Sequence, residues 1–308
     1  MNDMFRITAV ILALMMSTAP AAQIPSDTDM TLSAVSSQAQ TGKTVSYLGP
    51  EGTYTQEACG KFFDGRGTYA PYATVEEAVQ ALTEGRTDFA VIPQENTIGG
   101  AVTDYVDVLI GNKGVYVAGE VELPIDQDLL VIPGTQAEEI KTVYSHKQGI
   151  AQGREWVEKN LPNAELIEVS STAEGAKKVS ESGDKSCAAI ASGACADVYG
   201  LEIKAQAIQN NDRNKTRFYV LAAGRPTKRT GERTAFVASG KASDLPRLMT
   251  DIRRQKMTLV YIHDRPLKTE LGEYAYIIEC SGAGYEKYLS LKEGSAFKFR
   301  YLGSFDVR

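Results

Sequence analysis

Histidine is scarce in this chain, which leaves several classes of catalytic site poorly supplied. Only His146 and His263 occur in 308 residues. A zinc site and a Ser-His-Asp triad both depend on histidine, so neither is favoured here. We therefore look for chemistry that hydroxyl, amide and guanidinium groups can perform.

Cysteine is also sparse, and its four positions do not have metal-ligand spacing. Cys187 and Cys195 are the one close pair, and a disulfide between them is possible if the protein is exported. Cys59 and Cys280 are interpreted as small buried hydrophobes. The sequence leaves the pairing of Cys187 with Cys195 open.

The chain has no long basic run, and its charge is acidic overall. The formal net charge is -6 and the isoelectric point is about 5.2. A nucleic-acid surface needs a basic face, so nucleic acid is not an expected partner. The length and a hydrophobic share of 43% allow about two folded domains with sizeable cores.

Apolar runs of membrane-spanning length are absent, and a shorter run lies at the N-terminus. Arg6 precedes the apolar segment 7–16, and Ala19–Ala22 offers an A-x-A cleavage site. This succession predicts a secretory signal peptide over residues 1–22, with an uncleaved anchor as the alternative. The polar residues 23–43 predict a disordered leader. We expect an exported protein, periplasmic or secreted, without membrane association after cleavage.

Strand-like apolar segments alternate with amphipathic helices from Val45 to Ile190. This order favours two α/β lobes with crossing connections over one long sheet. Polar residues follow the buried strand 88–93 at the end where open α/β sheets bind ligands. The predicted fold over residues 44–224 is a two-lobed, periplasmic-binding-protein-like α/β domain with its site in the cleft.

A polar stretch over residues 210–218 lies between a half-buried strand pattern and an apolar run of strand length. We interpret it as a loop that brings the Thr216 hydroxyl, the Arg217 guanidinium and the Phe218 ring to one mouth. A plain solvated loop is the alternative, because Asn-rich turns are common.

The pattern changes after Ala222. A linker with Pro226 and several basic residues is followed by segments that predict the order βαββαβ. That order is typical of a ferredoxin-like α+β domain, which we place at residues 225–308.

Four motifs in this order resemble prephenate dehydratase with a C-terminal ACT regulatory domain. The motifs are Tyr47–Thr55 (YLGPEGTYT), Pro93–Gly100 (PQENTIGG), Ser145–Gln148 (SHKQ) and Asn214–Phe218 (NKTRF). In the C-terminal part, Arg265–Lys268 and Leu271–Tyr274 match the RPxK and LGEY of the ACT domain.

The resemblance implies conversion of prephenate to phenylpyruvate, with loss of CO2 and the ring hydroxyl and with no cofactor or metal. Thr216 would be the donor to the departing oxygen. Carboxylate binding would come from Arg217 and from neutral donors. The neutral donors are Thr53, Asn96, Ser145 and Gln152, while Glu95 and Phe218 would shape the cleft. A homodimer or homotetramer is expected.

The chain departs from the family at the phenylalanine site of the ACT domain. Where the family has GALV and ESRP, this chain places carboxylates and a histidine, which puts feedback regulation in doubt. The residues at the altered site are Asp244, Leu245, Asp264, Arg265 and Pro266. Two alternatives stay open: an arogenate or cyclohexadienyl dehydratase, and a non-catalytic periplasmic solute-binding protein.

Overall fold

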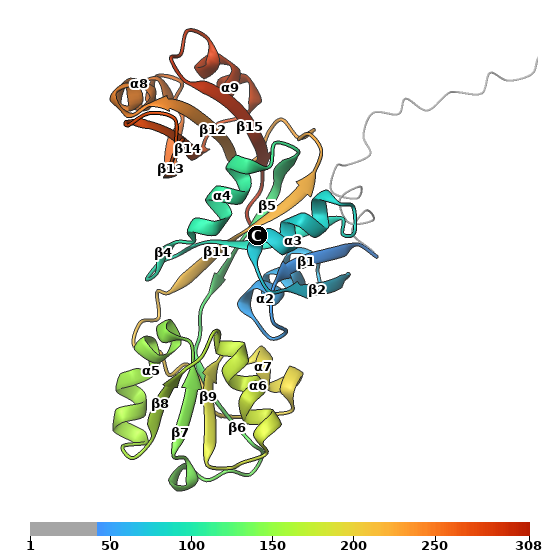
Figure 1. Ribbon diagram of the computed structural model, residues 1–308, viewed down its shortest axis with the longest axis vertical. Helices are drawn as coiled ribbons and strands as arrows, with labels where there is room; N and C mark the ends of the chain where they lie inside the picture. The colour runs from blue at the N-terminus through green and yellow to red at the C-terminus, as the bar shows by residue number, and fades with distance from the viewer. Residues whose placement is uncertain (1–41) are drawn as a thin grey trace, which may run out of the picture. The chain divides into compact units, whose positions relative to one another are not determined.

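A computed structural model describes residues 42–308 of the chain (Figure 1). The predicted signal peptide and nearly all of the predicted leader lie outside these described residues. No helix within residues 42–308 is long and apolar enough to span a membrane.

The first lobe is built on a mixed six-stranded sheet of order β2-β1-β3-β11-β5, with the short strand β4 paired to β3. Strand β1 runs parallel to β2 and β3, whereas β11 runs antiparallel to β3 and β5. The elements are β1 (Thr44–Leu48), α2 (Tyr54–Phe62), β2 (Thr68–Tyr72), α3 (Val75–Thr83), β3 (Phe89–Asn96), β4 (Gly100–Ala101), α4 (Thr103–Gly111), β5 (Val115–Pro124) and β11 (Lys215–Ala223).

The two faces of this sheet bury different apolar sets, because strand side chains alternate with a period of two. On one face, Phe62 of α2 and Phe218 of β11 belong to the same apolar cluster. On the other face, Leu109 of α4 and Tyr219 of β11 belong to a second cluster. Neighbouring residues of β11 therefore point to opposite sides of the sheet.

A β-bulge in β3 changes which of its residues face the same way. The partners of Arg217 and Phe218 on β3 skip Gln94, so Gln94 is the extra residue. One extra residue shifts the side-chain alternation by one position. Pro93 and Asn96 are three residues apart, yet both reach the same cavity.

The second lobe has a mixed five-stranded sheet of order β10-β6-β9-β7-β8. Strand β7 is parallel to β8 and β9, and β6 is antiparallel to β9 and β10. The elements are β6 (Asp128–Val131), η1 (Ala137–Glu139), β7 (Thr142–Ser145), α5 (Lys147–Asn160), β8 (Glu165–Glu168), α6 (Thr172–Ser182), β9 (Cys187–Ala191), α7 (Ala194–Tyr199) and β10 (Glu202–Ala205).

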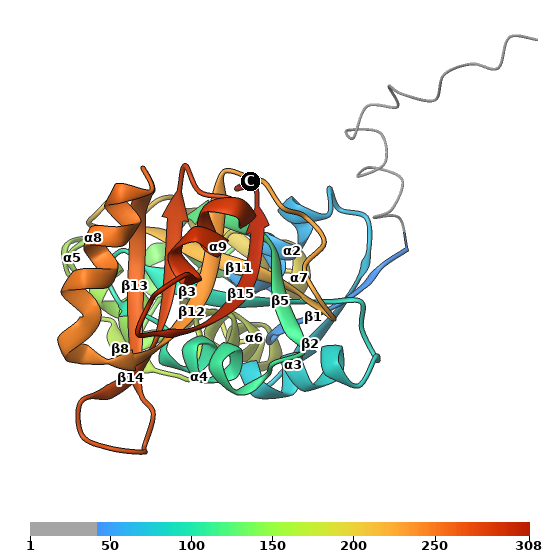
Figure 2. The same ribbon diagram turned by 90° about the horizontal axis from the view of Figure 1, so that it is seen from above.

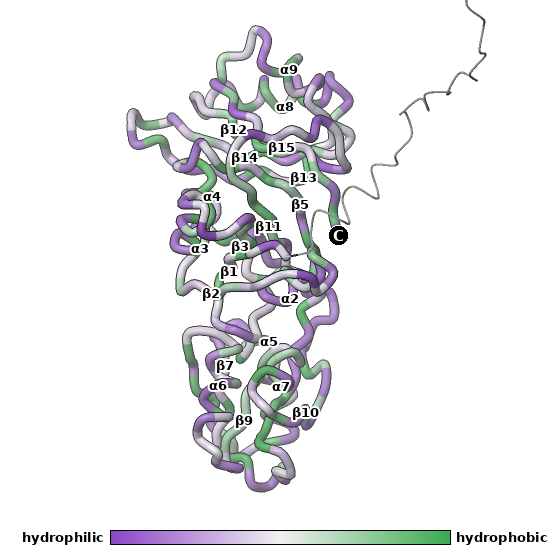
Figure 3. The backbone as a smooth tube through the Cα atoms, turned by 90° about the vertical axis from the view of Figure 1, so that its right-hand side faces the viewer, coloured by the Kyte–Doolittle hydropathy of each residue, from purple (hydrophilic) through white to green (hydrophobic). Residues whose placement is uncertain are grey.

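Helices cover both faces of the second sheet. Val157 of α5 and Ile190 of β9 belong to one cluster, and Ala176 of α6 and Ala189 of β9 belong to another. Every residue of β9 is buried, which explains its unbroken apolar sequence. Figure 3 shows this strand in the green of hydrophobic residues.

The candidate disulfide does not form in the described structure. Cys187 and Cys195 are both buried and free. Cys59 and Cys280 are buried as well, as predicted.

The C-terminal part is an antiparallel four-stranded sheet of order β13-β14-β12-β15. Its elements follow the predicted order βαββαβ. Figures 1 and 2 show α8 and α9 together over this sheet, and their side chains share its apolar cluster with Phe236. The opposite face joins the cluster of the first lobe through Tyr261 and Phe305. The elements are β12 (Arg233–Lys241), η2 (Ala242–Asp244), α8 (Leu245–Arg254), β13 (Thr258–Pro266), β14 (Glu273–Ser281), α9 (Tyr285–Lys292) and β15 (Lys298–Phe305).

The interpretation of residues 210–218 as a loop is wrong for its second half. Strand β11 begins at Lys215, so Thr216, Arg217 and Phe218 lie within a strand between β3 and β5. Because consecutive side chains of a strand point to opposite faces of the sheet, the three side chains cannot all line one binding site. Sequence also missed β2, which forms the edge of the first sheet.

Candidate active site

A cavity of about 240 Å³ is lined by residues from both lobes and from the segment that joins β5 to β6. Two hydrogen bonds tie the crossing segments together beside it: Ile125 N–H donates to Asn214 O, and Ile208 N–H donates to Gln127 O. The residues that line the cavity are Thr53, Tyr54, Thr55, Pro93, Asn96, Val102, Ile125, Gln127, His146, Gln148, Gly149, Gln152, Ser170, Ser171, Thr172, Thr216 and Phe218.

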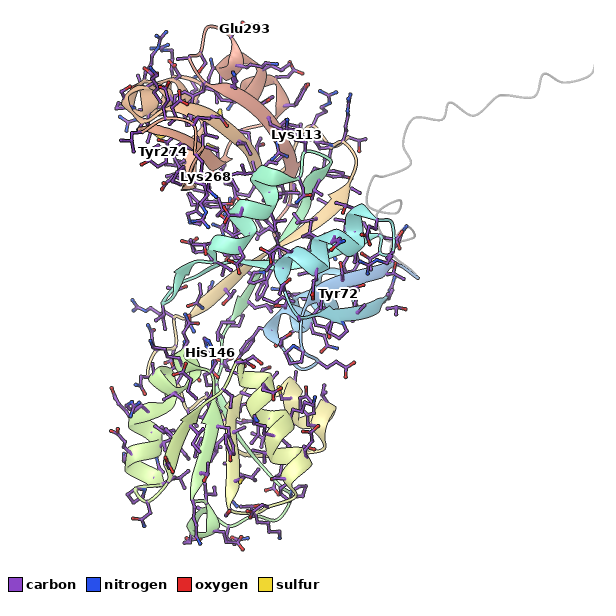
Figure 4. All side chains as sticks on the ribbon, in the orientation of Figure 1. Tyr72, Lys113, His146, Lys268, Tyr274 and Glu293 are labelled. Carbon is purple, nitrogen blue, oxygen red and sulfur yellow. The ribbon has the colours of Figure 1, made fainter. Side chains whose placement is uncertain are left out.

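Three helices begin at this cavity. The N-cap residues are Thr53 of α2, His146 of α5 and Ser171 of α6, and all three line it. Figure 4 labels His146 at the start of α5. Thr53 makes no side-chain capping bond, which leaves first-turn N–H groups of α2 for a ligand. Each helix N-terminus carries about half a positive charge.

None of the described residues that line the cavity is a lysine or an arginine. The attraction for an anion therefore comes from helix ends, hydroxyls and amides. The arrangement suits a negatively charged ligand whose carboxylates are held by neutral donors.

The hydrogen bonds around Thr216 leave its proton free for the cavity. Asn96 Oδ1 accepts from the backbone N–H groups of Ile98 and Gly99 at 3.0 and 2.8 Å, which fixes the orientation of the amide. Asn96 Nδ2 then donates to Asn214 Oδ1 and to Thr216 Oγ1, each at 2.9 Å. Since Thr216 Oγ1 already accepts a bond, its own O–H can donate to a ligand.

Asn96→Asp should lower kcat by at least about tenfold, because it removes the N–H that Thr216 accepts. The new carboxylate would accept from Thr216 and draw the hydroxyl proton away from the cavity. Steady-state kinetics measures the change. Asn163→Asp, at an exposed loop position of the second lobe, is the charge control and should leave kcat within about twofold. Equal kinetics for the two variants would contradict this role of Asn96.

Arg217 does not line the cavity, contrary to the prediction that it binds a substrate carboxylate. It lies on the opposite face of β11 from Thr216. Its Nη2 atom is 2.7 Å from Glu120 Oε1 and 2.7 Å from Glu279 Oε1. Both glutamate side chains have no exposed surface. Its guanidinium also lies over the ring of Tyr261, at 5.1 Å.

This ionic cluster joins three strands from two sheets. Glu120 lies on β5 and Arg217 on β11 of the first-lobe sheet, and Glu279 lies on β14 of the C-terminal sheet. Burial and the nearby Glu279 raise the pKa of Glu120 to about 8, against the lowering effect of Arg217. Oε2 of Glu120 is buried without a hydrogen-bond donor, which adds to the cost of ionising this carboxyl group. Burial disfavours the charge of Arg217, but Glu279 and Glu120 outweigh it and raise the pKa of Arg217.

Glu120→Gln should gain stability relative to wild type as the pH rises. A raised pKa means that the folded state holds the proton more tightly, so this contribution to stability is full below pH 4.5 and is lost by about pH 8. The variant lacks that loss. The difference in the free energy of unfolding between the variant and wild type should therefore grow by about 1.4 kcal/mol per pH unit within this window. Urea unfolding at several pH values measures it.

The control for this prediction is Glu122→Gln, at a carboxylate one-third exposed and 3.8 Å from the same guanidinium. Its stability difference from wild type gives, at each pH, the effect of removing one carboxylate beside Arg217. A Glu120→Gln difference that is flat between pH 5 and 8 would contradict the raised pKa.

Two further predicted residues lie outside the cavity. Ser145 is fully buried and donates to Ile190 O at 2.6 Å, so it anchors β7 to β9 behind the start of α5. Glu95 lies beside Arg217, at 3.6 Å, and lines a separate pocket on the other face of β11. Neither residue lines the cavity.

The structure brings the other predicted residues together. Thr53, Asn96, Gln152, Thr216 and Phe218 all line the cavity. Sequence reasoning assigned no ligand role to several further polar residues there. These are Tyr54, Thr55, Gln127, His146, Gln148, Ser170, Ser171 and Thr172. The pattern Ser171–Glu174 is a helix-start signal that could have pointed to Ser171 as a cavity residue, and the capping bond from Glu174 N–H to Ser171 Oγ is present at 3.0 Å.

Two residues of the segment predicted to hold the altered phenylalanine site, Arg265 and His263, contact the first lobe. Arg265 donates from Nε to Asp107 Oδ1 of α4 at 2.6 Å, and Nδ1 of His263 lies against the hydroxyl of Tyr105. Asp264 is exposed on β13, and Asp244 ends η2 directly before α8. The Arg265 guanidinium is thus already paired within the chain.

Residues 45–226 match the family described as "PDT: Prephenate dehydratase". The chain belongs to the prephenate dehydratase family. A curated relative, the bifunctional chorismate mutase/prephenate dehydratase of Stutzerimonas stutzeri, is 34% identical over 240 residues, which is 77% of this chain. The chain spans 65% of the length of that relative.

Solved structures support the family assignment and the fold. The prephenate dehydratase of Arthrobacter aurescens, solved in complex with L-Phe, has a TM-score of 0.76 and 29% identity, covering 85% of this chain and 90% of that one. The quorum-quenching acylase GqqA has a TM-score of 0.78 at 22% identity, covering 86% and 98%. The second likeness concerns the fold alone, so activity has to be argued from the cavity.

Proposed function

We propose that this protein is a prephenate dehydratase, which converts prephenate to phenylpyruvate, CO2 and water. The observation that carries the proposal is the Thr216 hydroxyl, which accepts from Asn96 and has its proton free at a cavity where three helices begin. Family membership supports the same reaction.

The reaction needs a donor at one end of the substrate and a place to release a carboxylate at the other. The C–C bond to the departing carboxylate breaks and its electrons enter the ring. The first break releases CO2, and the C–O bond at the opposite ring carbon breaks as the ring becomes aromatic. The hydroxyl leaves as hydroxide, which takes one proton from solvent to become water. A hydrogen bond from Thr216 stabilises the negative charge that develops on that oxygen.

Binding of the substrate carboxylates by uncharged donors suits this chemistry. A guanidinium would hold the substrate carboxylate strongly before the reaction, and only interactions that strengthen in the transition state speed the step. Helix N-termini and amides attract the dianion without one fixed ion pair. The pairing of Arg217 with Glu120 and Glu279, away from the cavity, is consistent with this design.

Incubation of the purified protein with prephenate tests the proposal. Phenylpyruvate absorbs strongly in alkali, so turnover should produce a signal that grows with time and with enzyme concentration. A solute-binding protein, the alternative function, would bind prephenate and leave it intact. Binding without any phenylpyruvate would overturn the proposal.

We also propose that residues 225–308 form an ACT domain in which phenylalanine has little effect. The strand order and the two helices over one face support the ACT assignment. Asp244 and Asp264 would repel the carboxylate of the amino acid, and Arg265 is engaged by Asp107. Inhibition of turnover by micromolar phenylalanine would show that the site is intact.

The remaining proposals concern the state of the protein in the cell. We propose export, on the signal-peptide pattern of residues 1–22, and assembly as a homodimer or homotetramer. Fractionation should find activity outside the cytoplasm, and sedimentation should give a mass above that of one chain. Recovery from the cytosol of protein that still begins at Met1 would contradict export.

A further inference from the structure

Gln127 carries a buried hydrogen-bond acceptor that nothing in the described chain satisfies. The residue is 2% exposed and lines the cavity. Its Nε2 atom donates to Gln152 Oε1 at 3.2 Å, while its Oε1 atom has no partner. Leaving a buried acceptor without a donor is costly, so a ligand group is the natural partner.

The backbone around Gln127 holds this side chain in place. Its N–H donates to Gln209 Oε1 at 2.8 Å, and its carbonyl accepts from Ile208 N–H at 2.7 Å. Gln152 is likewise 7% exposed, and its carbonyl accepts from Asn210 N–H. The two amides therefore meet where α5 lies against the crossing segments.

The amide pair presents one acceptor and one donor in either of two arrangements. As described, Gln127 Oε1 is the free acceptor and Gln152 Nε2 is the free donor. If both amides turn by half a rotation, Gln152 donates to Gln127 and the free groups exchange places. The Gln127 position can therefore accept from a ligand or donate to it.

The amide pair and Thr216 line the same cavity from different segments of the chain. Thr216 is paired with Leu123 of β5, and Gln127 follows four residues later in the crossing to the second lobe. In prephenate, the hydroxyl leaves from the ring carbon opposite the one that bears the three-carbon side chain. A substrate with its hydroxyl at Thr216 can therefore direct that side chain toward Gln127.

On the basis of the proposed function, we propose that Gln127, oriented by Gln152, contacts the substituent on the α-carbon of the side chain and determines substrate preference. A keto oxygen, as in prephenate, needs a donor. An ammonium group, as in the α-amino counterpart arogenate, needs an acceptor. The amide pair serves either group by turning, so the wild-type site accepts both the keto acid and the amino acid.

Gln127→Glu tests this role, because a carboxylate is an acceptor that cannot turn into a donor. The ratio of kcat/KM for arogenate to kcat/KM for prephenate should rise at least about tenfold, as a charged acceptor favours the ammonium. Gln148→Glu is the matched control: it adds the same charge to another glutamine of the cavity. It should shift the ratio less, since it affects only the total charge near the substrate.

A second variant covers the case in which the buried carboxylate prevents folding. Gln127→Met keeps the size and removes both polar atoms, and thermal unfolding checks that it folds. It should raise KM for both substrates several-fold with little change in the ratio. Two results would overturn the inference. One is a kcat/KM ratio of arogenate to prephenate that changes no more for Gln127→Glu than for Gln148→Glu. The other is an unchanged KM in Gln127→Met. Failure of the wild type to consume prephenate would instead refute the proposed function itself.

Discussion

Thr216→Ala should lower kcat about a hundredfold or more while leaving KM for prephenate nearly unchanged. The hydroxyl donates to charge that develops only in the transition state, and removal of one such donor costs about 2.7–4 kcal/mol in other systems. Because the lost interaction is absent from the ground state, kcat and kcat/KM should fall together. Steady-state kinetics with prephenate measures both.

Thr216→Ser and thermal unfolding separate this role from a structural one. Serine keeps the hydroxyl and the bond from Asn96, and it loses only the restraint of the methyl group on the rotamer. It should retain most of the activity. If Thr216→Ala melts like wild type and turns over prephenate at the wild-type rate, Thr216 has no part in the reaction.

Above about pH 8, where Glu120 is ionised, Arg217→Met should destabilise the fold by about 3–5 kcal/mol, because it leaves two fully buried carboxylates without their shared cation. The Nε atom of Arg233 lies 3.2 Å from Glu279 and remains there in the variant. Glu120 is therefore the glutamate that the loss of Arg217 affects most. The thermal midpoint should fall by about ten degrees or more. Thermal and urea unfolding measure the effect.

The control is the triple variant that adds Glu120→Gln and Glu279→Gln to Arg217→Met. Without the carboxylates the missing cation matters less, and most of the stability should return. Arg217→Lys should leave KM for prephenate within about twofold, since the side chain does not reach the cavity. A large rise in KM with normal stability would restore the carboxylate-binding role predicted from the sequence.

The sequence was sufficient for most strands of the sheets, though not for β2, and for the residues whose roles follow from local pattern. Alternating apolar segments predicted the lobes, and the order βαββαβ predicted the last sheet. Thr53, Asn96 and Thr216 belong to motifs at strand ends or helix starts, and all three reach the cavity.

Arg217 was misplaced because its environment is set by distant parts of the chain. The run Lys215–Arg217 is polar and looks like a loop, yet all of it pairs with β5, and Thr216 and Arg217 also pair with β3. Only within a strand does the period of two send Thr216 and Arg217 to opposite faces. The glutamates that neutralise Arg217 come from β5 and β14, and no local pattern indicates them.

The roles of Ser145 and Gln127 also depend on distant parts of the chain and could not be predicted from local sequence. Ser145 has the residue type of a ligand donor, but Ile190 O, a backbone acceptor 45 residues away, already uses its hydroxyl. Gln127 lies in an ordinary segment between two strands and matches no motif. Its importance follows from burial and from an unpartnered oxygen, and both properties exist only in the folded chain.

The structure of Thr216→Ala with unreacted prephenate bound tests the central claim most directly. The account predicts the ring hydroxyl within hydrogen-bond reach of the position that the Thr216 oxygen occupies in wild type, about 2.6–3.2 Å. It also predicts the substrate carboxylates at the N-termini of α2, α5 or α6. A carboxylate at residue 216, with the ring hydroxyl directed to another part of the cavity, would contradict it.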